Sequence, residues 1–300
     1  MTFLFYDDSP VFGGHEVMSL LGVEALLQDD SHAVRFIATA SNVTLLDKLG
    51  QIKTRFPALE TETTANHSSK LEALKNRFAS GGVAALAKRF SELRPDLVIA
   101  VQGNIEHSSL AILAANKAKL KVASYIPVPH SHAEMGAKLG GIRDLFTGYL
   151  FKAPDAFVTI SDEMAAMLRT RGVVCPIKIV YNGVDTTRFA SRNKVEARAA
   201  LGIPTGAAVF GMVGRVELKQ KQQHLLVQAV ASDPGLREKC HLVFAGDGPD
   251  SAALSAKIEA AGLAAKVTRL PWCDPASLYP ALDALIIPSR YEGLPLVMLE

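Results

Sequence analysis

The sequence is poor in cysteine, in tryptophan and in net charge. Its 300 residues include three cysteines and one tryptophan, and the formal net charge is +2. Cys175, Cys240 and Cys273 are far apart and lack paired metal-ligand spacing, which argues against a disulfide framework or a zinc module and favours reduced thiols. The nearly balanced charge, with no basic stripe lined by aromatic residues, argues against nucleic acid as a partner.

Long apolar runs are also missing. No stretch is long enough to cross a bilayer, and the opening segment Thr2–Tyr6 is too short and too quickly followed by acids to be a signal peptide. We therefore expect a cytoplasmic protein. The basic run from Lys70 to Arg94 alternates with apolar residues and is typical of a solvated helix face, although it leaves open a peripheral contact with a membrane.

What the sequence does contain is an ordinary globular composition, with 49% apolar and 21% charged residues. Buried strands alternate with helices in the first half, at Thr2–Tyr6, Val34–Ala38, Leu97–Val101, Lys121–Val128, Ala156–Ile160 and Lys178–Tyr181. The second half repeats the alternation, with strands at residues 209–213, 242–245, 267–270 and 283–287. This pattern predicts two α/β domains with parallel sheets, which we place at residues 1–185 and 186–300.

Some parts of the first half are harder to assign. The helical pattern from Lys70 to Leu93 is expected to break at Gly81-Gly82. The segments Lys53–Ser69 and Ala133–Ile142 carry few signals of any kind.

Residues just past the carboxyl ends of parallel strands line the ligand crevice of an open sheet. Gly13-Gly14 follows the first strand and would let backbone approach a phosphate or sugar, but the pair alone is more often only a tight turn. His130 and His132 follow a later strand. We choose His130, nearer the strand end, as the site candidate and interpret His132 as a surface-loop histidine. Metal binding is not expected, since only Glu134 is near them.

The strand ends of the second half carry groups suited to a nucleoside diphosphate. Arg215 and Lys221 follow its first strand and could neutralise a diphosphate. Gly246 and Gly248 would permit close approach of a ribose or base. Trp272 could border the base, or it could equally be a half-buried packing residue.

The closing stretch adds an anion site between carboxylates. Glu292 is followed by Gly293, Leu294 and Pro295, where a turn and a helix start would bring backbone N–H groups together. Glu300 would lie roughly 1.4 turns beyond Pro295. Because the carboxylates can accept hydrogen bonds from sugar hydroxyls, this combination favours a nucleotide sugar as the ligand.

These motifs occur in a recognisable order. From about residue 156 onward they are Val180-Tyr181-Asn182-Gly183-Val184-Asp185, Val213-Gly214-Arg215-Val216, Gly246-Asp247-Gly248-Pro249, Pro288-Ser289, and the E-x7-E pair Glu292 and Glu300. In this order and spacing the chain resembles the family-4 retaining glycosyltransferases, which have the GT-B architecture of two facing Rossmann-like domains. Gly13-Gly14-His15-Glu16 and His130 match more loosely. The family's usual Lys-Gly is Lys221-Gln222 here, so Lys219 remains an alternative to Lys221.

The resemblance implies transfer of a sugar from a nucleoside-diphosphate sugar, with UDP- or GDP-sugar expected, to a glycan, lipid-linked or small-molecule acceptor with retention of anomeric configuration. Arg215 and Lys221 would hold the leaving diphosphate. Glu292 would bind donor-sugar hydroxyls, and His130 would contact the sugar near the reacting carbon. No metal or cofactor is expected, because the cations would stabilise the developing charge.

Further residues are assigned to donor binding. The resemblance places Glu300 on the ribose hydroxyls and brings Gly13-Gly14 to the diphosphate from the other domain. The whole set is Gly13, Gly14, Gly246, Gly248, Trp272, Gly293, Leu294 and Glu300.

Other functions remain open on the same fold. A nucleotide-sugar epimerase or an inverting transferase would use a similar site, and a non-catalytic nucleotide-sugar-binding module would use it without reaction. Family members usually continue through further helices after the second motif carboxylate. We therefore expect the chain as given to be incomplete in its second domain, with weak or no activity.

Overall fold

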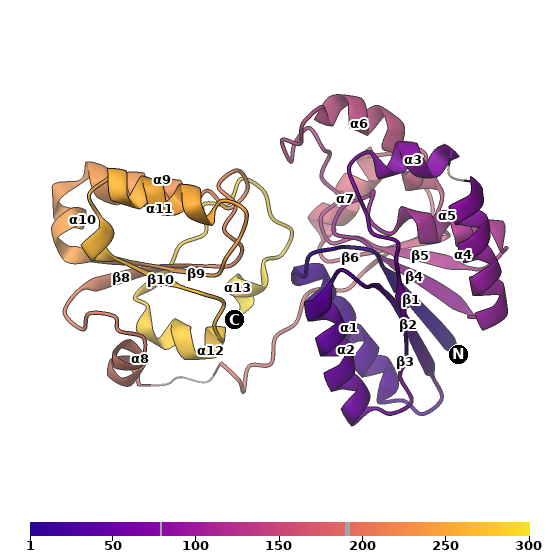
Figure 1. Cartoon of the computed structure of the whole chain (residues 1–300), viewed down its shortest axis with the longest axis horizontal. Coiled ribbons are helices and arrows are strands. Elements are labelled where there is room, and N and C mark those ends of the chain that lie inside the picture. Colours follow the sequence, from indigo (N-terminus) through magenta and orange to yellow (C-terminus); the bar gives the residue numbers. More distant parts are fainter. Residues whose placement is uncertain (79, 190–192) are drawn as a thin grey trace. The chain divides into compact units, whose positions relative to one another are not determined.

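The computed structural model describes residues 1–78, 80–189 and 193–300 of the chain. They form two compact units, Met1–Asn182 and Gly183–Glu300, each built on a parallel sheet covered by helices (Figure 1). The predicted α/β class with parallel sheets is confirmed. Among the helices of these ranges, none has the length and apolar character needed to cross a membrane.

The described part of the first unit has a sheet in the order β3-β2-β1-β4-β5-β6-β7, with every neighbouring pair parallel. Its strands are β1 (Thr2–Asp7), β2 (Ala33–Thr39), β3 (Glu60–Thr64), β4 (Leu97–Val101), β5 (Val122–Tyr125), β6 (Ala156–Thr159) and β7 (Ile177–Ile179). The chain builds outward from β1 to β3 and then crosses to β4 on the other side. The order therefore reverses between β1 and β4, and the loops after these strands border a crevice.

Strand β1 is apolar on both faces because helices cover both. Leu4 and Tyr6 pack in one core cluster with Phe90, while Phe5 packs in another with Val23. Successive side chains of a strand point to opposite faces, so this sequence suits a central parallel strand. The helices are α1 (Gly14–Leu27), α2 (Val43–Arg55), α3 (Glu72–Phe78), α4 (Ser80–Leu93), α5 (Ser109–Lys117), α6 (Gly140–Thr147), the 3-10 turn η1 (Leu150–Lys152) and α7 (Asp162–Thr170).

The helical pattern from Lys70 to Leu93 is divided into two helices as predicted, but the predicted position of the break, Gly81-Gly82, is wrong. Helix α4 runs through both glycines, and the preceding α3 ends at Phe78. Glycine lowers helix stability by only about 1 kcal/mol relative to alanine. Helix α4 buries Leu86 and Phe90 in the core, and this packing outweighs the local preference.

Regular elements also occur where the sequence carried few signals. Strand β3 reads ETETT and lies at the edge of the sheet, where it pairs only with β2, so its polar composition gives no apolar pattern to detect. Helix α6 lies within the stretch after Ala133 and begins at Gly140. Its polar residues face the protein and its apolar residues face solvent.

The described residues of the second unit form a smaller parallel sheet in the order β10-β9-β8-β11. Its elements are α8 (Lys194–Ala200), β8 (Ala208–Val213), α9 (Gln223–Ser232), α10 (Pro234–Lys239), β9 (Cys240–Ala245), α11 (Ser251–Ala260), η2 (Ala264–Lys266), β10 (Val267–Leu270), α12 (Pro275–Leu278), η3 (Tyr279–Ala281), β11 (Ala284–Leu285) and α13 (Leu296–Leu299). Strand β9 alternates between cores, with Leu242 and Phe244 in one cluster and Val243 and Ala245 in the other. The order reverses between β8 and β11, which places the ligand crevice of this sheet after those strands.

Candidate functional site

The reversal point of the second sheet brings a lysine and a glutamate together. Lys221, in the loop after β8, has its Nζ 2.5 Å from Oε1 of Glu292, in the loop after β11. The two side chains remain 24% and 20% exposed, so the pair is partly open to solvent. The loops are also joined through backbone, since the N–H of Arg290 donates to the carbonyl of Gln220 at 2.8 Å. The predicted residues Lys221 and Glu292 therefore meet although they are far apart in sequence.

The residue after Lys221 explains one departure from the family pattern. Gln222 precedes α9 with a φ of 54°, in the left-handed region that glycine adopts readily. The glycine of a Lys-Gly pair would fit this conformation without strain. Gln222 adopts the same backbone, so the loop that carries Lys221 keeps its turn without the glycine.

A second cation lies at the same edge. The Arg215 side chain is 50% exposed, and its Nε is 3.7 Å from Oε2 of Glu217. The backbone of Arg215 is fixed, because its carbonyl accepts a hydrogen bond from Nε2 of Gln223 at 2.9 Å. Lys219, the alternative to Lys221, is exposed in the same loop. The edge thus offers an anchored loop with cations directed to solvent, which suits an anion.

The packing of two loops requires glycine at positions 246 and 248. A Cβ at Gly246 would lie 2.3 Å from the carbonyl oxygen of Gly214, and one at Gly248 would lie 2.3 Å from that of Val216. Gly246 also has a φ of 121°. The glycines therefore let the loop after β9 pack closely on the loop after β8. This contact supports the shape of the edge whether or not a ribose or base approaches the same glycines.

The remaining predicted donor residues lie at other points of the second unit. Trp272, after β10, is 71% exposed, so the alternative that it is a half-buried packing residue is wrong. Glu300 accepts a hydrogen bond from the hydroxyl of Tyr279 at 2.6 Å. Burial, and then this carboxylate, raise the pKa of Tyr279. Gly293 and Leu294 are half-buried and precede α13, whose single turn contributes little helix dipole.

The reversal point of the first sheet holds a buried cluster of titratable groups. Asp7 ends β1, and His15 and Glu16 begin α1. The Nε2 of His15 lies 3.0 Å from Oε1 of Glu16, whose other oxygen accepts from the N–H of Gly13 at 2.7 Å. His107 approaches from the loop after β4, with its ring centroid 6.2 Å from that of His15. Asp7 and Glu16 are fully buried.

Burial and mutual charge set the protonation of this cluster. Burial, partly offset by the charge of His15, raises the pKa of Asp7 to about 8. Burial lowers the pKa of His15, but the charge of Glu16 outweighs it and the pKa is raised. Burial and the charge of His15 lower the pKa of His107 to about 4. At neutral pH the cluster therefore contains a protonated Asp7 and a neutral His107, while the contact with Glu16 favours the charged form of the His15 imidazole.

Asp7, His15 and Glu16 are also the group of potential metal ligands that lies closest together. Their ligand atoms are within 4.8 Å of one another, and no other set of three such residues in the described ranges is as compact. A metal bound here would compete with the proton that the contact between His15 and Glu16 favours, since metal binding requires a neutral imidazole.

His132 was predicted to be a surface-loop histidine, and this prediction is wrong. It is 1% exposed. Its Nδ1 lies 2.9 Å from Oδ1 of Asp144, which also accepts from its backbone N–H at 2.8 Å, and its Nε2 lies 3.2 Å from Oε2 of Glu106. Arg143 pairs with the same Glu106 carboxylate. His130, the predicted site residue, is half-buried in the loop that this network holds.

Sequence reasoning missed Asp7, His107, Glu106 and Asp144. Asp7 could have been found, because it is the last residue of β1 and strand ends border the crevice. Glu106 and Asp144 could not, because their role depends on α6, which carried no sequence signal.

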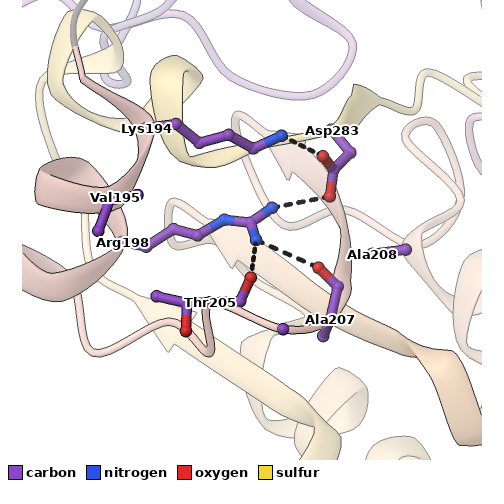
Figure 2. Close-up of a pocket in the computed structure, with 8 residues that line it drawn as sticks. Lys194, Val195, Arg198, Thr205, Ala207, Ala208 and Asp283 are labelled. Carbon is purple, nitrogen blue, oxygen red and sulfur yellow. Dashed lines mark hydrogen bonds and ion pairs between the residues drawn. The ribbon is translucent and has the colours of Figure 1, made fainter.

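A surface pocket elsewhere in the second unit is structural. It lies at the start of β8, opposite the edge that carries Lys221 and Glu292, and its charged side chains bind one another (Figure 2). Arg198, which is buried, donates to Asp283 at 2.7 Å and to the carbonyl oxygens of Thr205 and Ala281 at 2.9 Å. Contacts from Lys194, Val209 and Arg198 lower the pKa of Asp283 to about 2. The network fastens α8 to β8.

Comparison with known sequences identifies the family. The sequence model described as Glycosyltransferase Family 4 matches residues 12–188, more than half of the chain, and the model described as Glycosyl transferases group 1 matches residues 193–300. The chain belongs to glycosyltransferase family 4, as the motifs predicted.

Individual relatives are more distant. The D-inositol 3-phosphate glycosyltransferase of Saccharomonospora viridis is 36% identical over 137 residues, which cover 41% of this chain and 31% of the relative. That of Mycobacterium bovis is 31% identical over 159 residues, covering 50% and 32%. The matches thus span about a third of the length of these curated relatives.

Solved structures share the fold. Anabaena HepE, solved in complex with UDP-glucose, has a TM-score of 0.73 at 18% identity, with 98% of this chain and 75% of HepE covered. Sucrose-phosphate synthase from Thermosynechococcus elongatus has a TM-score of 0.71 at 17% identity, covering 99% and 77%. These likenesses confirm the predicted GT-B fold class.

Proposed function

We propose that this chain binds a nucleoside-diphosphate sugar at the carboxyl edge of its second sheet and transfers the sugar to an acceptor with retention of anomeric configuration, without a metal. The Lys221–Glu292 pair beside Arg215 carries the proposal. Family membership supports the reaction class. The charge pattern supports the ligand class, because the cations lie in anchored loops and stay accessible.

We assign distinct roles to the charged groups. The barrier of the reaction is departure of a diphosphate from a sugar that acquires oxocarbenium character. Arg215 and Lys221 would stabilise the negative charge that develops on the diphosphate, since cations held in place need little reorganisation. In the free protein Glu292 neutralises Lys221. When the diphosphate takes over Lys221, the Glu292 carboxylate can accept hydrogen bonds from donor-sugar hydroxyls.

The other site residues remain predictions that specific observations support. A Cβ at Gly14 would meet no described atom within 4 Å, so the fold does not need this glycine and close ligand approach is a reason for it. His130 is half-buried, as a residue that contacts a sugar near the reacting carbon would be. Glu300 would bind ribose hydroxyls while Tyr279 orients its carboxylate. Exposed Trp272 can border a base.

The comparisons suggest which substrates to try first. HepE was solved with UDP-glucose, which supports a uridine nucleotide as donor. Curated relatives are named for D-inositol 3-phosphate, which supports a phosphorylated polyol among the small-molecule acceptors, beside glycans and lipid-linked sugars.

Calorimetric titration with UDP, GDP and ADP tests the donor site directly. We expect one diphosphate to bind with at least tenfold preference over the others and to raise the melting temperature in step with its concentration over Kd. Binding of none of them would contradict the proposal.

Proton NMR of the anomeric centre then tests the reaction. A product with the donor's anomeric configuration supports a retaining transferase. An inverted product or an epimerised nucleotide sugar would each replace it by one of the rival functions named above.

A further inference from the structure

Helix α6 of the first unit has the reverse of the usual burial pattern, with polar residues buried and apolar residues exposed. Its polar residues face the protein, since Asp144 binds His132, Arg143 pairs with Glu106, and Thr147 is buried. The start of the helix is pressed on the preceding loop, because a Cβ at Gly140 would lie 2.6 Å from the backbone nitrogen of Ala133. The buried side of α6 is therefore fixed by charge and close packing rather than by apolar contacts.

The apolar residues of α6 face solvent instead. Leu139 is 66% exposed, Ile142 51%, Leu145 81% and Phe146 38%. Ile142, Leu145 and Phe146 have the spacing that places side chains on one helical face. Figure 1 shows α6 at the periphery of the first unit beside α3, and the last residue of α3, Phe78, is 76% exposed. A fold normally buries such a stripe, so this one is available to something else.

Cations flank this apolar face. Lys138 is exposed directly before α6. At the other end, the guanidinium of Arg77 in α3 lies 5.6 Å from the ring centroid of Tyr149, and the hydroxyl of Tyr149 donates to the carbonyl of Ala73 at 2.8 Å. These contacts hold α3 against the end of α6. The one acid of α6, Asp144, is used on the buried side, so no carboxylate of α6 belongs to the outer face.

We propose that the α6 strip, defined as Leu139, Ile142, Leu145 and Phe146 with Phe78, Lys138 and Arg77, docks on the surface of an anionic lipid bilayer. The proposal concerns a surface of the first unit and does not depend on the donor site. It replaces the broad basic run from Lys70 to Arg94 as the membrane contact. Of that run, only the end of α3 belongs to the strip.

Size and charge favour a bilayer over a protein partner. The eight residues of α6 rise about 12 Å. A stable protein interface buries about 800 Å² and about 20–30 residues on each partner, whereas the strip has the seven residues named above. A bilayer requires only that apolar side chains enter the headgroup boundary by about 5–10 Å while nearby cations meet anionic lipids. The alternation of exposed apolar and basic groups in the strip matches that requirement.

Vesicle flotation tests the proposal without any enzymatic substrate. The whole chain is mixed with vesicles of phosphatidylcholine alone or with phosphatidylglycerol added. We expect binding to the anionic vesicles only, weakened by salt. The double variant Ile142→Ser/Leu145→Ser should have an affinity for the anionic vesicles at least about tenfold lower than the parent. The affinity of Lys138→Glu should be at least about fivefold lower.

The matched control is Val174→Ser. Val174 is 89% exposed in the same unit but lies outside the strip, so this variant should bind like the parent. Because the substituted side chains are exposed, all variants should keep the parent melting temperature. Equal vesicle binding by the parent and the double variant would overturn the proposal, as would absence of binding to anionic vesicles. Concentration-dependent dimerisation lost in the double variant, without vesicle binding, would assign the strip to a second copy of the chain instead.

Discussion

The carboxyl edges of the two sheets hold charge in opposite ways. In the first unit Asp7 and Glu16 are fully buried, and the imidazole of His15 contacts Glu16. In the second unit Lys221 and Glu292 stay partly exposed, and Arg215 is half exposed with only a distant partner. A buried ion pair holds its partners tightly because separating them leaves a desolvated charge. Under the proposed function, the second edge would exchange its internal partners for a diphosphate, whereas the first edge keeps its own.

The largest expected effect is at Lys221. Lys221→Met should weaken binding of the preferred nucleoside diphosphate by about a hundredfold, because a hydrogen bond to a charged group is worth about 1.5–3 kcal/mol. Lys219→Met is the matched control. It removes the same charge from an exposed position of the same loop and should change binding less than about threefold through long-range charge alone.

Calorimetry on both variants separates the two lysines. The reverse ranking would assign the cation to Lys219. Equal small losses would remove the contrast between the two edges, since the second edge would then not bind the anion through its charges.

The same contrast explains what the sequence could and could not predict. Lys221, Arg215 and Glu292 stand in the loops that follow β8 and β11, so reading the strands was enough to bring them to one edge. The parallel sheets followed from the alternation of strands and helices. At the first edge, by contrast, the environment of His132 is made by Asp144 and Glu106 from separate elements. An exposed apolar face on α6 reverses the usual burial pattern, so neither the helix nor the burial of His132 could be inferred.

The next largest effect should separate the two histidines of one loop. His132→Ala leaves the Glu106 and Asp144 carboxylates without the imidazole between them, and a buried group left without its hydrogen-bond partner costs about 1–3 kcal/mol. Because Glu106 keeps Arg143 and the Asp144 side chain is 23% exposed, we expect a loss of about 2 kcal/mol. His130→Ala should cost less than about 1 kcal/mol in unfolding free energy while lowering transfer activity.

Urea unfolding can localise this loss. Trp272 is the one tryptophan of the chain and lies in the second unit, so its fluorescence should report an unchanged second unit, while circular dichroism should detect the weakened first unit. Equal losses for the two histidine variants would contradict the assigned difference in their burial and contacts.

A smaller effect concerns the pH dependence of the first edge. The pKa of Asp7 is raised to about 8, chiefly by burial, so the folded state holds a proton that the unfolded state releases near pH 4. Stability at this site is therefore full below about pH 4 and declines as pH rises to about 8. Asp7→Asn cannot ionise, so its stability relative to the parent should increase by at least about 1 kcal/mol between pH 5 and pH 8.

Melting temperatures at several pH values check this prediction. Asp30→Asn, at an exposed position, serves as the control and should track the parent at every pH. Parallel pH profiles for Asp7→Asn and the parent would show that Asp7 is ionised in the folded protein. The Asp7 carboxylate would then be a charged group at the first edge, as Lys221 and Glu292 are at the second.

The smallest expected stability effects come from two glycines of α1. A Cβ at Gly14 or at Gly22 would meet no described atom within 4 Å, and neither has a positive φ. Gly22→Ala, inside the helix, should raise the unfolding free energy by about 0.5–1 kcal/mol, and Gly14→Ala, at its first residue, by less. If Gly14 is open because a diphosphate approaches it, Gly14→Ala should lower transfer about tenfold in a protein that is no less stable, whereas Gly22→Ala should leave transfer unchanged. Full activity in both variants would leave ligand recognition to the second edge alone and restrict the first edge to holding its own loops.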